Sequence, residues 1–141
     1  MKTILKKLSI ALMICTVLAF SLASCSSGID KDEAKLFIED FLEAVEAQDY
    51  EKAKTYLHPE RPVDLGAFLE EVESQEKMDF QAGIELEKYT GFSSSYYNSD
   101  VDGSRYEVTI KAKVGDKNVE FTVEVVKNDK GYGIYNFVID T

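Results

Sequence analysis

The side chains that could act as an acid or a base are one histidine and 26 aspartates and glutamates. His58 precedes Pro59, and the residue before a proline is biased away from helical geometry. We therefore expect His58 to lie at a helix end with its ring in solvent. Catalysis needs a histidine or carboxylate beside a polarising group, or a serine or cysteine beside such a base. The sequence shows neither arrangement, which predicts that the chain is not an enzyme.

The sequence also has few residues that could form a metal site. There is one histidine, and the carboxylates are spread along predicted polar helix faces instead of converging. The run Asp100-Val101-Asp102-Gly103 has part of the pattern of a calcium loop but lacks its remaining ligands and closing glutamate. We expect a turn at this run, and neither a metal nor a cofactor in the protein.

Aromatic side chains are the third group that could do chemistry, with 8 tyrosines, 8 phenylalanines and no tryptophan. Tyrosines on an open concave sheet can line a ligand cavity, since each adds apolar area and a hydroxyl group. Ordinary core and edge positions are the alternative interpretation of the same residues. The predicted ligand-binding residues are Tyr89, Phe92, Tyr96, Tyr106 and Tyr135.

Cys25 has the most specific predicted chemistry. It ends the run Leu22-Ala23-Ser24-Cys25, after a basic start and an apolar stretch, residues 10–22, that is short for a membrane span. This pattern is typical of a bacterial lipoprotein signal, in which the mature chain begins at the cysteine and the cysteine carries diacylglycerol and fatty acids such as palmitate. The alternative is an ordinary secretory peptide with Cys25 left as a free thiol.

The signal predicts three segments. We expect a signal peptide over residues 1–24, a lipidated cysteine and short tether over residues 25–30, and one domain over residues 31–141. The chain from Cys25 onward is close to the commonest single-domain size. The domain would lie on the extracytoplasmic face of the cell membrane, held there by its lipid.

Charge narrows the possible partners. Lys2, Lys6 and Lys7 would leave with the leader, so the formal charge would change from −10 to −13. An excess of this sign argues against nucleic acid, which is bound mainly through lysine and arginine, and against docking on anionic lipid headgroups. A protein or small-molecule ligand remains possible, and simple solubility is the alternative reason for the charge.

Helical spacing dominates the first half of the chain. Asp30 and Glu33 predict the start of a four-turn amphipathic helix, and Gln48-Asp49 interrupts it. We expect Asp49 to cap a short second helix that ends at His58-Pro59. A third helix is predicted from Asp64 to about Lys77.

Alternating hydrophobicity dominates the second half. Strands are predicted over residues 84–97, with a bulge near Gly91, and then from about 105 to 114, 119 to 125 and 132 to 140. Turns are predicted at residues 98–104, 115–117 and 128–131. These short connections favour an antiparallel meander. The predicted class is therefore α+β, with about three helices packed on a curved four-stranded antiparallel sheet.

The alternation also assigns the two faces of the sheet. The apolar face should pack on the first helix through Phe37, Phe41 and Val45. Cross-strand pairs are expected on the polar face, with Lys111 or Lys113 opposite Glu120 or Glu124. The residues predicted on the polar face are Arg105, Glu107, Thr109, Lys111, Lys113, Glu120, Thr122 and Glu124.

The order of these elements resembles the nuclear transport factor 2-like superfamily, specifically its small bacterial lipoproteins. The likeness is carried by residues 37–45, then 49–53, and by the ending Lys130–Tyr135. It implies a cone-shaped α+β fold, and a cystatin-like sheet around one helix is the near alternative. Members include isomerases and dehydratases as well as non-catalytic binding domains, so fold does not decide function. We expect a non-catalytic binding or interaction role; the alternatives are a small-molecule carrier with a tyrosine-lined cavity and, less favoured, such an enzyme.

Overall fold

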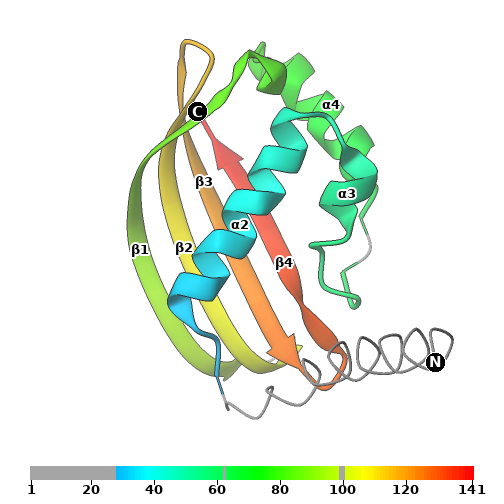
Figure 1. Ribbon diagram of the computed structural model, residues 1–141, viewed down its shortest axis with the longest axis vertical. Helices are drawn as coiled ribbons and strands as arrows, with labels where there is room; N and C mark the ends of the chain where they lie inside the picture. The colour runs from blue at the N-terminus through cyan, green and yellow to red at the C-terminus, as the bar shows by residue number, and fades with distance from the viewer. Residues whose placement is uncertain (1–27, 62, 99–100) are drawn as a thin grey trace, which may run out of the picture.

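The computed structural model describes residues 28–61, 63–98 and 101–141, with side chains throughout these ranges except at 92–98 and 101–102. Three α-helices precede a four-stranded antiparallel sheet in these residues. The predicted α+β class is therefore confirmed. Helix α2 crosses one face of the sheet, while α3 and α4 lie beside strand β4 (Figure 1).

Helix α2 spans Lys31–Glu46 and begins at the predicted cap. The Asp30 carboxylate accepts from the backbone N–H groups of Asp32 and Glu33, both at 2.9 Å, which satisfies two amides that lack a partner within the helix. One side of the helix is apolar and faces the sheet. Its buried residues are Ala34, Ile38, Phe41, Leu42, Ala44 and Val45.

Helix α3 spans Tyr50–Lys54, and its cap is also the predicted one. The Asp49 carboxylate accepts from the backbone N–H of Lys52 at 3.1 Å. The predicted end of this helix at His58-Pro59 is wrong. The chain leaves helical geometry earlier because the residues that follow pair with β4 instead.

Helix α4 spans Leu65–Glu76, close to the predicted limits. The Asp64 carboxylate accepts from the backbone N–H of Ala67 at 3.2 Å, and Lys77 ends the helix in a left-handed conformation with φ of 51°. A short 3-10 turn at Phe80–Ala82 leads into the sheet.

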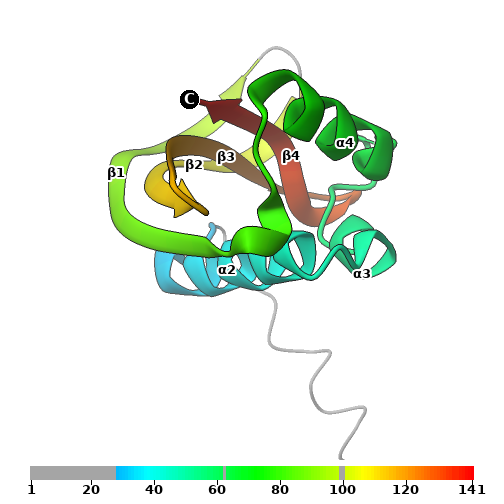
Figure 2. The ribbon, with the colours of Figure 1, turned by 90° about the horizontal axis from the view of Figure 1, so that it is seen from above.

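The sheet is a meander in the order β1, β2, β3, β4, and it curves around α2 (Figure 2). Each strand is antiparallel to its neighbour, as the short connections predict. Its strands are β1 (Ile84–Asn98), β2 (Val101–Val114), β3 (Lys117–Asn128) and β4 (Gly131–Asp140).

The β1–β2 hairpin confirms the predicted bulge but not the predicted length of the turn. The bulge near Gly91 is confirmed, because the β1–β2 register shifts between Thr90 and Ser93 and Gly91 has φ of 69°. The predicted turn over residues 98–104 is wrong in extent. Pairing continues to Asn98 opposite Val101, so both strands are longer than their sequence pattern indicates.

The apolar face of the sheet packs on α2, as predicted. Phe41 is fully buried, and its ring centroid lies 5.2 Å from that of Phe137 in an edge contact. Phe137 stacks on Phe121 at 5.6 Å. The buried residues of the two central strands are Tyr106, Val108, Ile110, Ala112, Val114, Val119, Phe121, Val123, Val125 and Val126, together with one charged residue, Glu124.

The outer face shows one of the predicted charge pairs in register. Lys111 lies opposite Glu120 across β2 and β3. Lys113 instead forms an ion pair with Glu87 of β1, with 3.0 Å between nitrogen and oxygen. Exposed pairs of this kind contribute about 0.2–1 kcal/mol each, so they help to set register more than stability.

Candidate functional site: a pocket beside strand β4

The chain after α3 lies along the free edge of β4. Ile134 donates its backbone N–H to the carbonyl of Tyr56 at 2.7 Å and accepts from the N–H of His58 at 2.8 Å. Leu57 and Ile134 thereby form a parallel bridge. Gly133 permits this approach, because a Cβ atom there would lie 2.6 Å from the backbone nitrogen of His58. One isolated parallel bridge therefore joins the loop before Pro59 to this edge of the sheet.

A pocket of about 270 Å³ lies next to this pairing. Four consecutive residues of β4 line it, so it borders the edge of the strand and not one face of the sheet. The opposite wall comes from the loop before α4 and from the first turn of that helix. The lining residues are Leu57, Arg61, Val63, Leu65, Phe68, Ile134, Tyr135, Asn136 and Phe137.

Tyr135 is turned toward this pocket by a bulge in β4. Glu124 pairs with Asn136 and Val125 pairs with Ile134, so Tyr135 is an extra residue in the strand. Its ring lies 5.9 Å from the ring of His58, and the Arg61 guanidinium carbon lies 5.6 Å from its centroid. Tyr135 thus lies near both a buried histidine and a cation.

His58 is buried, and the predicted solvent-exposed position is wrong. The residue is 1% exposed. Its Nδ1 accepts from the backbone N–H of Glu60 at 3.1 Å, so Nε2 carries the proton and donates to Asn128 Oδ1 at 3.1 Å. Local sequence gave no sign of Asn128, the last residue of β3, which lies 70 residues away in the chain. In this arrangement His58 has a structural role beneath the pocket.

Glu124 is a second correction to the predicted surface. The sequence predicts a solvated side chain on the outer face, but the residue is 6% exposed. Its carboxylate accepts from Arg105 at 2.7 Å, and Arg105 also lies 3.3 Å from Glu107. Burial raises the pKa of Glu124, while the charges of Arg105 and Arg61 oppose that rise.

The other predicted ligand-binding residues lie away from this pocket. Tyr89 donates its hydroxyl hydrogen bond to Glu39 of α2, and the Lys35 ammonium lies 4.5 Å from its ring centroid. Burial and this carboxylate raise the pKa of Tyr89. Tyr106 is 1% exposed, in the core. The structure therefore brings Tyr135 alone, of these three, to the pocket.

Three predicted site residues cannot be placed in this way. The side chains of Phe92 and Tyr96 and the whole of Cys25 lie outside the described parts of the chain. The backbone puts Phe92 and Tyr96 in β1, as their alternation predicts.

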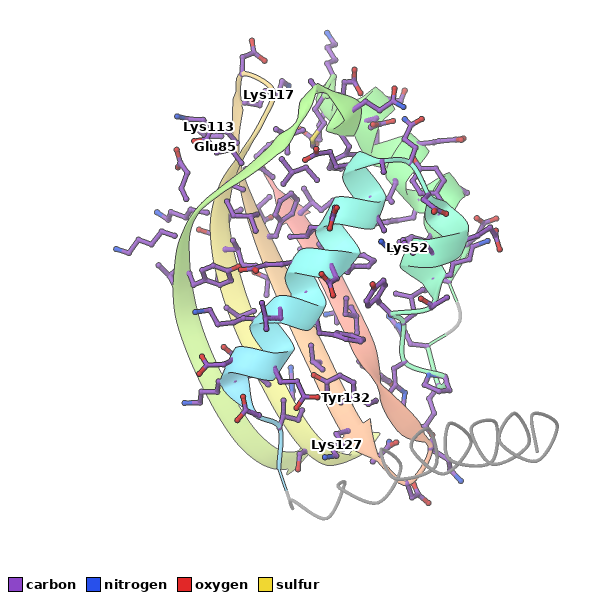
Figure 3. The ribbon with its side chains drawn as sticks, viewed as in Figure 1. Lys52, Glu85, Lys113, Lys117, Lys127 and Tyr132 are labelled. Atoms are coloured by element: carbon purple, nitrogen blue, oxygen red, sulfur yellow. The ribbon has the colours of Figure 1, made fainter. Side chains whose placement is uncertain are left out.

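A further tyrosine, Tyr132, lies at the end of the sheet where α2 begins, near Lys127 (Figure 3). Its ring makes an edge contact with Phe37 at 4.9 Å. Burial, with the nearby charges of Glu33 and Asp30, raises the pKa of Tyr132 to about 12. These contacts extend the core and do not form part of the pocket.

Most of the pocket was not predictable from the sequence. Arg61, Val63 and Asn136 showed no periodic or motif signal, since the wall that they form exists only after the loop meets β4. One usable signal was present. Pro59 and Pro62 are the two prolines of the chain and enclose Arg61, and such spacing favours an extended loop that can lie along a sheet edge.

No protein-family model, curated protein or solved structure matches this chain. Within residues 28–61, 63–98 and 101–141, none of the helices has the length and hydrophobicity needed to cross a bilayer. The same ranges hold no group of three or more His, Cys, Asp or Glu side chains arranged to bind a metal ion.

Proposed function

We propose that this protein is a membrane-anchored extracytoplasmic domain with a non-catalytic binding role. Lipid on Cys25, at the end of the Leu22–Cys25 motif, would hold it at the outer face of the cell membrane. Two residues separate Cys25 from Gly28, whose carbonyl accepts from the Lys127 ammonium at 3.4 Å. This contact ties the first described residue to the sheet, which supports a position close to the bilayer.

We also infer a nuclear transport factor 2-like fold instead of a cystatin-like one. The support is the number of helices that precede the sheet. A cystatin-like sheet wraps around one helix, whereas α3 and α4 here follow α2 and lie beside β4 (Figure 1). The fold leaves catalysis and binding equally open.

The observation that carries the binding role is the pocket beside β4. Aromatic and aliphatic side chains form most of its wall, with a few polar groups among them, which is the usual composition of a small-molecule site. Two carboxylates with specific partners lie outside its lining, since Glu39 accepts from Tyr89 and Glu124 accepts from Arg105. This separation favours binding over acid–base catalysis.

The anchor is tested by labelling cells with a fatty-acid probe. The wild-type protein should incorporate the probe and sediment with membranes, whereas Cys25→Ala should do neither. Retention of label and of membrane association in Cys25→Ala would show that Cys25 is not the lipidated residue.

The pocket is tested by NMR titration of the full-length protein in detergent micelles with phenylacetamide, a neutral aromatic probe. Binding should shift the backbone amide signals of residues 134–137. Val63→Trp should abolish these shifts, because Val63 lines the pocket and is 42% exposed, so that the larger side chain can enter the pocket without disturbing the core.

Val138→Trp is the matched control. Val138 is 39% exposed and is not a lining residue, so this variant should bind the probe as the wild type does. If neither phenylacetamide nor phenylacetate shifts the signals of residues 134–137 in the wild type, the proposed binding role of this pocket is wrong.

A further inference from the structure

We propose that the pocket beside β4 binds a small monocarboxylate with a compact apolar body, whose carboxylate pairs with Arg61. The inference rests on the binding role proposed above and adds the chemical class of the ligand. It follows from the state of Arg61, from the partners of the carboxylates around it, and from the character of the wall.

Arg61 brings a positive charge to the pocket lining, and this charge acts on Glu124 through space, without a direct ion pair. Its guanidinium lies over the Tyr135 ring, with the carbon 5.6 Å from the centroid. Its side chain forms no ion pair or hydrogen bond with any residue in the described parts of the chain. A planar guanidinium has five N–H donors and matches a carboxylate in two-point geometry. Those donors remain available to a ligand.

Two acidic residues near Arg61 already have direct partners elsewhere. Glu60, its neighbour in sequence, accepts from Asn128 Nδ2 at 2.8 Å. Glu124 accepts from Arg105 at 2.7 Å. An arginine without an ion-pair partner is notable in a chain with 26 acidic residues and 16 basic ones. A ligand carboxylate would supply the missing partner.

The side chains of the pocket wall next to Arg61 indicate the chemical character of the ligand beyond its carboxylate. Leu65 and Phe68 of α4 face Ile134 and Phe137 of β4, so the body of the ligand meets aliphatic and aromatic carbon. A ligand rich in hydroxyl groups would lose hydration there without gaining partners. The strongly negative domain would also repel a multiply charged anion. One negative charge on a compact apolar body fits both conditions.

The test compares phenylacetate with phenylacetamide, which differ in the charged group and share the aromatic body. Both are titrated into the full-length protein in micelles at equal ionic strength, and dissociation constants are taken from the amide shifts of residues 134–137. Charge-assisted hydrogen bonds to Arg61 should make phenylacetate bind about five- to tenfold more tightly. Arg61→Gln should remove that difference, so that phenylacetate and phenylacetamide bind the variant with equal affinity.

Lys52→Gln is the matched control, because it also removes one positive charge but lies on α3, outside the pocket lining (Figure 3). It should keep the preference for phenylacetate. Equal binding of the two probes to the wild type, or an undiminished preference in Arg61→Gln, would overturn this inference and leave the binding role intact. If neither probe shifts residues 134–137, both the inference and the binding role fail.

Discussion

The Nε2 of His58 lies 3.1 Å from the Oδ1 of Asn128, and this contact joins the loop after α3 to the end of β3. The same Asn128 oxygen accepts from the backbone N–H groups of Lys130 and Gly131, at 2.9 and 3.1 Å. One side chain therefore shapes the turn and holds the loop. Because that loop forms a wall of the pocket, the stability of the contact decides whether the pocket exists.

His58→Ala should lower the free energy of unfolding by about 3 kcal/mol, because it leaves a buried space and removes partners from Asn128 and from the Glu60 amide. Urea titration of the wild type and variant measures the loss. Asp129→Ala, in the same turn but exposed, should change stability by less than about 0.5 kcal/mol. Equal effects of the two substitutions would show that His58 does not hold the loop.

Gly133→Ala should also release the loop from β4. The added Cβ would lie within 3 Å of backbone atoms of Leu57 and His58, which cannot move aside as a flexible side chain can. We expect a loss of about 3 kcal/mol on thermal or urea unfolding. The control is Gly66→Ala in α4, where the nearest atom is a Tyr50 ring carbon at 3.3 Å and the change should stay within about 1 kcal/mol of zero. A Gly133→Ala protein as stable as Gly66→Ala would refute the close packing of loop and strand.

Phe41→Ala tests the assignment of the two faces of the sheet. Phe41 is fully buried between α2 and the sheet, so its loss should cost about 3–5 kcal/mol in a denaturant titration. Thr109 lies on the outer face, with its hydroxyl 3.4 Å from that of Thr122, and Thr109→Ala should cost less than about 1 kcal/mol. Similar losses for the two variants would mean that the faces are reversed.

Glu124 should make stability depend on pH. Its pKa is raised above the ordinary value of 4.5 in the folded state, chiefly by burial, so the fold binds its proton more tightly than the unfolded chain does. The stability of the wild type relative to Glu124→Gln should therefore fall as the pH rises through and above 4.5. Below that value the carboxyl is protonated in both states, and the difference should level off.

Urea titrations of both proteins between about pH 4 and pH 7 measure this difference, and contributions from the other titrating groups cancel. Glu120→Gln is the control for loss of a carboxylate from the same strand; Glu120 lies opposite Lys111 and not against Arg105. A difference that grows in favour of the wild type as the pH rises would contradict the raised pKa of Glu124.

The elements of this fold were predictable because their signals are local. Asp30, Asp49 and Asp64 each lie two or three residues before the amides that they cap, so each helix start is encoded within one turn of chain. The alternation of β2 and β3 likewise assigns the inner and outer faces from neighbouring residues. Short connections then leave an antiparallel meander as the simplest topology.

Contacts between segments distant in sequence decided the features that could not be predicted from the sequence. The end of α3 and the burial of His58 depend on the pairing of residues 56–58 with β4, more than 70 positions later in the chain. The burial of Glu124 depends on its contact with Arg105 of the neighbouring strand β2. The sequence alone determined which segments are helix or strand, since propensity, capping and alternation act over a few residues. Only tertiary packing decided which polar groups lose contact with water and where a pocket remains, because burial depends on surfaces brought together from both halves of the chain.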